Sequence, residues 1–332
     1  MKKIYLHIGT HKTGTTSFQQ LIRQNAQALQ AQNIYVPPVG KLISSKGEYQ
    51  LHKGGLHLIS NAFKGKANID VVSAYLEAFE NSGCASACLS SEGFDELTSV
   101  EVSNLARVFS SYEIEILLVL RHPLSLATSL FCSKGAVGRA DNLKYLSNTL
   151  NNRRLFNYSS LINNYSSIGR IKIIKYEDCE NINLELLKAI NVININIEGS
   201  ENRVRQSLAP HVAIANRQIY SALEVSEKTY LNSIYPYLIE FADILANSNS
   251  DEYLKFNKNS PFPTDKQKVF MKEWGEMVFD VNCSVMQEDR WASWREIKPM
   301  GDYVNPTAVS DFKEKFLFWL FSTHLTKKKI LI

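Results

Sequence analysis

The first 200 residues alternate between short apolar runs and segments with a helical spacing of apolar side chains. Residues 4–8 form an apolar run bounded by Gly9, which predicts a buried strand. Over residues 16–32 apolar side chains recur at helical spacing, which predicts a helix. Residues 113–120 are the most continuous apolar run, as expected of a strand covered on both faces. This order of elements predicts a parallel sheet with helices on both sides.

The same patterns assign the remaining elements. Strands are predicted over residues 34–36, 85–90 and 171–175, and helices over residues 71–79, 100–110, 124–133 and 184–189. Residues 40–66 are polar and are predicted to be irregular. After residue 200 the strand signals fade, and helices are predicted over residues 212–222, 230–247 and 266–279. We therefore expect a core over residues 1–210 and a helical C-terminal extension over residues 211–332 that packs on it.

Composition limits the function without naming it. The chain has 332 residues, of which 45% are apolar and 21% charged, as in ordinary globular proteins. Its net charge of +4 is too small to indicate nucleic-acid binding. The five cysteines are scattered, so we expect reduced thiols rather than a disulfide framework or a zinc site. No apolar stretch is long enough to span a membrane, so we expect a cytoplasmic location.

A loop rich in glycine and threonine lies between the first strand and the first helix. Residues 9–16, here called the 9–16 loop, read Gly-Thr-His-Lys-Thr-Gly-Thr-Thr. Its two glycines let backbone N–H groups converge on an oxyanion, and the helix N-terminus adds its positive end. This unit predicts an α/β, P-loop-type three-layer fold with a central parallel sheet flanked by helices, plus a mainly helical C-terminal part.

The loop differs from one that binds a nucleoside triphosphate. Such a loop carries lysine directly after its second glycine, whereas this chain has Thr15 there. Lys12 is the only lysine of the loop and stands near its front. This position suits neutralisation of a leaving group on a phosphate-anchored donor, without help from a metal.

The strand and the 9–16 loop together resemble the 5′-phosphosulfate-binding loop of the PAPS-dependent sulfotransferase family, whose donor is 3′-phosphoadenosine 5′-phosphosulfate (PAPS). The resemblance implies a sulfotransferase that uses PAPS as co-substrate and needs no metal. It implies that Lys12 stabilises the leaving phosphate. It also implies that the donor is bound by His11, Lys12, Thr13, Gly14, Thr15 and Thr16.

Three later segments resemble the same family. Residues 117–129 are similar to its 3′-phosphate-binding segment, in which Arg121 ends a strand and Ser129 follows in the next helix. The planar guanidinium group of arginine suits a phosphate. Residues 173–178 are similar to a later strand that ends in Tyr-Glu-Asp, which implies that Tyr176 lies near the adenine. Residues 201–208 loosely resemble a basic segment that returns to the nucleotide; they contribute Arg203 and Arg205, for which a solvated basic loop is an equal alternative.

The resemblance covers residues 1–210 and departs from part of the family at one position. Members that act on small phenols carry tryptophan directly after the last loop threonine, where this chain has Ser17. Serine there fits the bacterial, carbohydrate-type branch better. We therefore expect the acceptor to be a sugar hydroxyl, on a surface glycan or a glycolipid.

Sulfuryl transfer also needs a base for the acceptor proton, placed at the carboxyl end of a strand. Glu92 follows the strand over residues 85–90, and several carbohydrate-modifying members of the family use a glutamate. His57 and His52 are the competitors, in a segment expected to border the acceptor cleft. His11 is expected to shape the donor loop rather than to take the proton.

Other functions stay open on the sequence alone. A P-loop nucleotide-binding protein or phosphotransferase with a modified loop would share the same strand, loop and helix. A non-catalytic adaptor that uses the helical half would bind neither donor. Residues 312–332 combine aromatic side chains with a run of three lysines, and they either pack on the core or contact the inner face of an anionic membrane.

Overall fold

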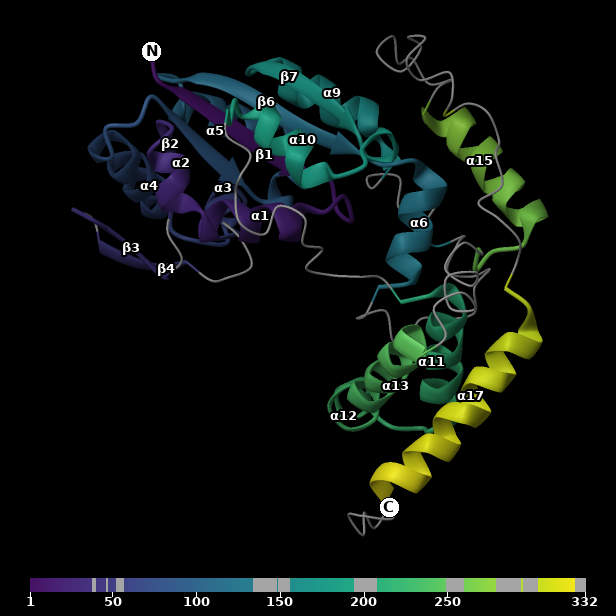
Figure 1. Cartoon of the computed structure of the whole chain (residues 1–332). Coiled ribbons are helices and arrows are strands. Elements are labelled where there is room, and N and C mark those ends of the chain that lie inside the picture. Colours follow the sequence, from purple (N-terminus) through teal and green to yellow (C-terminus); the bar gives the residue numbers. More distant parts are fainter. Residues whose placement is uncertain are drawn as a thin grey trace. The chain divides into compact units, whose positions relative to one another are not determined.

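The computed structural model describes residues 1–37, 40–45, 47–51, 57–133, 148, 156–193, 208–248, 260–278, 294 and 304–325 (Figure 1). The chain divides into two units. The first comprises Met1–His122 and Asn157–Gln206, and the second comprises Pro123–Phe156 and Ser207–Ile332. The first unit contains the five-stranded sheet and the 9–16 loop, so it carries most of the candidate site.

Five parallel strands form the sheet of the first unit, in the order β2-β5-β1-β6-β7. Their bounds are β1 (Lys3–Gly9), β2 (Ile34–Tyr35), β5 (Ser86–Ser90), β6 (Glu113–Leu120) and β7 (Arg170–Lys175). The chain adds β2 and β5 on one side of β1 and then crosses to add β6 and β7 on the other. At such a reversal, α/β proteins bind ligands beyond the carboxyl ends of the strands. The predicted α/β fold with a central parallel sheet is confirmed.

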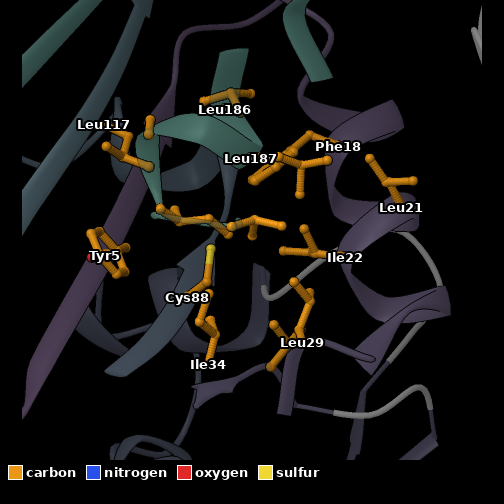
Figure 2. Close-up of a cluster of buried hydrophobic side chains, with 14 of the residues drawn as sticks. Tyr5, Phe18, Leu21, Ile22, Leu29, Ile34, Cys88, Leu117, Leu186 and Leu187 are labelled. Atoms are coloured by element: carbon orange, nitrogen blue, oxygen red, sulfur yellow. The ribbon is translucent and has the colours of Figure 1, made fainter. Parts of the chain in front are cut away.

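Helices α1 (Thr15–Gln24), α2 (Ala26–Gln30) and α10 (Ile182–Ala189) cover one face of this sheet. Phe18, Leu21 and Ile22 share one side of α1 because of their helical spacing. Figure 2 shows them directed into a cluster with side chains from α10 and from the strands. Each large apolar side chain buried in this way contributes about 1.5–3 kcal/mol, so the cluster fixes the start of α1 on the sheet.

The opposite face of the sheet is also covered. Side chains alternate along a strand, and Leu6, Ile116 and Leu118, which point away from the first cluster, are fully buried. Here α5 (Ser99–Val108) contacts both α3 (His57–Phe63) and α9 (Tyr158–Ser166), and α9 contacts β7. Helix α4 (Asp70–Asn81) packs beside α3. The sheet therefore lies between two layers of helices.

The prediction that residues 40–66 are irregular is wrong. Its described part contains an antiparallel hairpin, β3 (Gly40–Ser44) with β4 (Gly47–Leu51), and α3. The carboxylate of Glu77 on α4 accepts hydrogen bonds from the backbone N–H and the hydroxyl of Ser45, at 3.1 and 2.7 Å, which ties down the turn. The hairpin leaves Ile43 exposed. Backbone pairing specifies this element, so apolar periodicity could not reveal it.

The described part of the second unit is helical. It contains α6 (Pro123–Phe131), α11 (Pro210–Ala222), α12 (Glu227–Ser233), α13 (Tyr235–Ser248), α15 (Thr264–Val278) and α17 (Pro306–Leu320), which a turn of π-helix over Phe321–Leu325 extends. The single helix predicted over residues 230–247 is instead two, because Pro236 has no backbone N–H to donate to the carbonyl four residues earlier, which breaks the helix there. Among the described residues, no helix is both long and apolar enough to cross a bilayer.

Candidate functional site

The 9–16 loop begins at the carboxyl end of β1 and leads into α1. Gly9 and Gly14 have φ angles of 96° and 84°, in the region that favours glycine. A Cβ atom on Gly14 would also lie 2.8 Å from the Cγ2 atom of Ile182 on α10. Glycine is therefore required at the point where the chain enters α1.

The loop is anchored to the neighbouring strand. The backbone N–H of Thr10 donates to the carbonyl of Val119 on β6 at 2.9 Å. The hydroxyl of Thr13 donates back to the carbonyl of Thr10, which curls the loop on itself. Gly14 offers no side chain to cap α1, and no acidic residue lies in the first turn of that helix. The positive end of α1 is thus turned to the loop without an internal anion, as anion-binding helix N-termini are.

Arg121 reaches the loop from the adjacent strand end. It directly follows β6, and its Nη1 atom donates to the carbonyl of Lys12 at 2.6 Å. Its guanidinium carbon lies 4.5 Å from the centre of the Tyr176 ring, which follows β7. The Tyr158 hydroxyl donates to the carbonyl of Arg121 at 2.7 Å and fixes its backbone. Lys12, Arg121 and Tyr176 therefore lie together at the carboxyl ends of three neighbouring strands.

Glu177 completes this side of the site. Its carboxylate accepts the backbone N–H of His122 at 3.0 Å and lies 4.0 Å from the Nε atom of Arg121. The anion holds the strand end after β6 and the guanidinium group together. It also means that a phosphate at Arg121 would share this cation with a carboxylate.

Glu92 lies on the other side of β1. It begins the short 3-10 helix η1 (Glu92–Phe94) after β5, and its side chain is 23% exposed. The backbone N–H of Ser91 donates to the carbonyl of His7 on β1 at 3.1 Å, which fixes the start of η1. The ring of His57, on α3, lies 3.3 Å from the Ser91 hydroxyl through its Nδ1 atom. Both candidate bases are thus next to Ser91, His57 through its contact with the hydroxyl and Glu92 as the following residue, whereas His52 lies outside the described residues.

His11 connects the loop to η1 and to the residue that follows it, Asp95. Its Nδ1 atom lies 2.7 Å from Oδ2 of Asp95, and its Nε2 atom lies 3.9 Å from Oε2 of Glu92. The hydrogen bond to Asp95 raises the pKa of His11 to about 9, although burial opposes the rise. Burial raises the pKa of Asp95, and the hydrogen bond from His11 opposes that rise. At neutral pH the pair is an imidazolium held by a buried carboxylate.

Asp95 was not among the residues that the sequence singled out. It follows Glu92 by three positions, and side chains three apart in a 3-10 turn lie on the same side. A 3-10 turn after β5 was the signal that could have found it. Its partner His11 is 84 positions away in the sequence, so the contact itself depends on the pairing of β1 with β5.

One group of residues in the described part of the chain could hold a metal ion. His11, Asp95 and Glu96 offer ligand atoms within 4.8 Å of one another. Glu96 forms an ion pair with Lys64, and Asp95 is bonded to His11. Because each carboxylate already has a cationic partner, the arrangement does not call for a metal to balance its charge.

The other residues that the sequence singled out belong to further elements or lie outside the described residues. The Ser17 hydroxyl accepts a hydrogen bond from the Asn183 side chain of α10 at 3.0 Å. Ser129 is buried on α6, in the second unit. Arg203 and Arg205 lie outside the described residues. Comparison of the chain with protein-family models, curated proteins and solved structures gave no match.

Proposed function

We propose that this protein is a sulfotransferase that moves a sulfuryl group from PAPS to an acceptor hydroxyl. The observation that carries the proposal is the 2.6 Å hydrogen bond from Arg121 to the carbonyl of Lys12. It joins the cation suggested for the 3′-phosphate to the loop suggested for the 5′-phosphosulfate. The strand order, with the 9–16 loop after the central strand, supports a P-loop-type fold.

Each end of the donor would meet a different group. The loop amides, those of Thr13 and Thr15 among them, and the N-terminus of α1 would hold the 5′-phosphosulfate, with the Thr16 hydroxyl as a side-chain donor. Arg121 would bind the 3′-phosphate, together with Ser129 and Arg203. Tyr176, already stacked with the Arg121 guanidinium group, would lie near the adenine.

The transfer is an in-line displacement at sulfur. The acceptor oxygen forms a bond to sulfur while the bond from sulfur to the bridging phosphate oxygen breaks. Lys12 neutralises the charge that develops on the leaving phosphate, and Glu92 takes the acceptor proton. The products are a sulfate ester and adenosine 3′,5′-bisphosphate, and the acceptor proton is left on Glu92.

Donor binding separates this function from a nucleotide-binding protein or phosphotransferase. Calorimetry with adenosine 3′,5′-bisphosphate in the presence of EDTA is expected to show binding. MgATP, measured separately without EDTA, is expected to bind much more weakly. Tight MgATP binding with no response to the bisphosphate would favour a P-loop phosphotransferase. An adaptor would respond to neither ligand.

We further propose a sugar hydroxyl on a surface glycan or glycolipid as the acceptor. Ser17 is engaged by Asn183 of α10, so this position supplies no aromatic ring of the kind found in enzymes for small phenols. The candidate base is a carboxylate. To identify the acceptor, the protein is incubated with radiolabelled PAPS and fractionated extract of the source cell. Mass spectrometry then identifies the molecules that gain a sulfate. Label found only in phenols, amines or protein tyrosines would overturn the choice of acceptor.

A further inference from the structure

His11 bridges the two acidic residues of the turn after β5. Its Nδ1 atom and its backbone N–H both contact Oδ2 of Asp95, at 2.7 and 3.2 Å. Its Nε2 atom lies 3.9 Å from the carboxylate of Glu92. The next residue in the chain is Lys12. One side chain therefore lies within ion-pair distance of the suggested base and is adjacent in sequence to the suggested cation.

The turn that His11 contacts is itself firmly held. Phe94 is fully buried, and its carbonyl accepts a hydrogen bond from the Tyr165 hydroxyl at 2.7 Å. The Ser91 hydroxyl accepts the backbone N–H of Gly93 at 3.2 Å and caps the turn. Because the turn is held in this way, Asp95 has a fixed position. Asp95 therefore positions His11 of the loop, rather than the reverse.

Asp95 needs its hydrogen bonds from His11 to offset the cost of burying its carboxylate. Its Oδ1 atom is buried and has no hydrogen-bond partner in the described structure, while Oδ2 accepts both bonds from His11. A buried carboxylate without a partner is strongly unfavourable. The pairing of these two residues is therefore stringent, and it holds the ring in one orientation.

We propose that His11, held as an imidazolium by Asp95, is a positioning residue that fixes the Glu92 carboxylate and the Lys12 backbone in one reactive geometry. This inference rests on the sulfotransferase function proposed above. Lys12 is then held from both sides, by the His11 anchor before it and by the hydrogen bond of Arg121 to its own carbonyl. His11 takes no proton from the acceptor.

The surrounding acidic groups favour the charged form of His11. The groups that face it are Asp95 and Glu92 of the turn and Glu96, which is paired with Lys64 at the end of α3. All three acidic groups raise the pKa of His11, to about 9. Activity should therefore fall as the pH rises through about 9, because the link to Glu92 is lost.

The first test is substitution of His11 by asparagine, whose amide can still donate to Asp95 but cannot reach Glu92. Transfer from radiolabelled PAPS into the acceptor fraction labelled by the wild-type protein should fall about tenfold, as expected for one charged contact. Affinity for adenosine 3′,5′-bisphosphate should fall much less than the transfer rate, because the other loop residues and Arg121 still hold the nucleotide. In a Glu92→Gln background the same substitution should have little further effect, because the two residues act as one unit. Lys64→Met, which breaks the neighbouring ion pair with Glu96, is the matched control.

The second test measures the protonation of His11. In Asp95→Asn the alkaline fall of kcat/KM should move down by about one pH unit or more, because the partner that raises the pKa is lost. NMR titration of the free protein should show His11 titrating near pH 9 in the wild type and lower in the variant. This readout needs neither donor nor acceptor, and a purely structural role for His11 would not move the activity profile.

The outcomes separate the two proposals. Additive losses for His11→Asn and Glu92→Gln in an active enzyme would overturn only the positioning role. An ordinary pKa for His11 in the wild type, unchanged in Asp95→Asn, would also overturn it, even if His11→Asn fails to fold. Failure of the wild type to bind adenosine 3′,5′-bisphosphate would refute the sulfotransferase function and this inference with it, while the NMR titration would still report on the ion pair.

Discussion

Lys12 is the residue on which the proposed chemistry depends most directly. Its backbone φ is 62°, and its carbonyl is bonded to Arg121, so the position is well fixed. We expect Lys12→Ala to lower the rate of sulfuryl transfer about 10²–10³-fold, because one preorganised charge donor is lost. Rates with radiolabelled PAPS check this, and the exposed Lys66→Ala is the control for loss of one positive charge. Wild-type turnover in Lys12→Ala would contradict the role of Lys12.

A second prediction concerns Arg121, whose suggested role can be tested separately from that of Lys12. It is suggested to contact only the 3′-phosphate, so Arg121→Ala should weaken binding of adenosine 3′,5′-bisphosphate about 10–100-fold, the range for a charge-assisted hydrogen bond. Binding of adenosine 5′-phosphate should change far less. Ser129→Ala is expected to act in the same direction with a smaller effect. Calorimetry with both nucleotides measures the difference, and equal losses for the two would refute the 3′-phosphate site.

At the scale of elements, α17 has two apolar sides. Phe312 and Phe316 pack on Phe241 of α13 within the second unit. On the other side, Phe318 of α17 is 77% exposed, and Phe321, in the π-helical turn that extends the helix, is 54% exposed. The buried side packs within the second unit, and the exposed side is the one that the membrane hypothesis requires, since three lysines follow at residues 327–329.

We expect the exposed side of α17 to contact anionic lipid. The double variant Phe318→Ser and Phe321→Ser should lower co-sedimentation with phosphatidylserine-containing vesicles at least about tenfold, because two aromatic rings no longer leave water. Donor affinity should not change. Val269→Ser, which removes an exposed apolar side chain from α15, is the matched control. Equal sedimentation of the wild type and the double variant would leave α17 as a packing element alone.

Over the whole molecule, the elements with buried faces could be predicted from the sequence, whereas the side-chain pairs between distant elements could not. β6 begins and ends at the predicted residues because both of its faces are buried and its apolar run is unbroken. α9 was missed although Tyr158, Ile162 and Tyr165 have helical spacing, since serine and asparagine fill the other positions and obscure the signal.

The candidate site shows the same division. The 9–16 loop could be recognised in the sequence because its turn and the entry into α1 require glycine locally. The contact of His11 with Asp95 could not be recognised in the sequence, because it arises only when β5 pairs with β1. The residues next to a turn determine its backbone conformation, whereas an ion pair between neighbouring strand ends depends on the topology of the folded sheet.

The ion pair between His11 and Asp95 should also be visible in the stability of the whole chain. The folded-state pKa of His11 lies above its unfolded value, so its contribution is complete below about pH 6.5 and is lost as the pH rises through about 9. Three other histidines have pKa values that burial lowers, so their effects lie below this window: His7, His122 and His211.

We therefore expect the free energy of unfolding of the wild type to fall by about 1–2 kcal/mol more than that of His11→Gln between pH 6.5 and 9.5, a value reduced for a side chain that is 34% exposed. Urea unfolding at a series of pH values measures the difference. Burial raises the pKa of Cys88 to about 12, which also lowers stability at alkaline pH, but this loss is common to both proteins and cancels. If the two curves run parallel across this range, His11 carries no extra proton in the folded state, and the ion pair with Asp95 is not formed in solution.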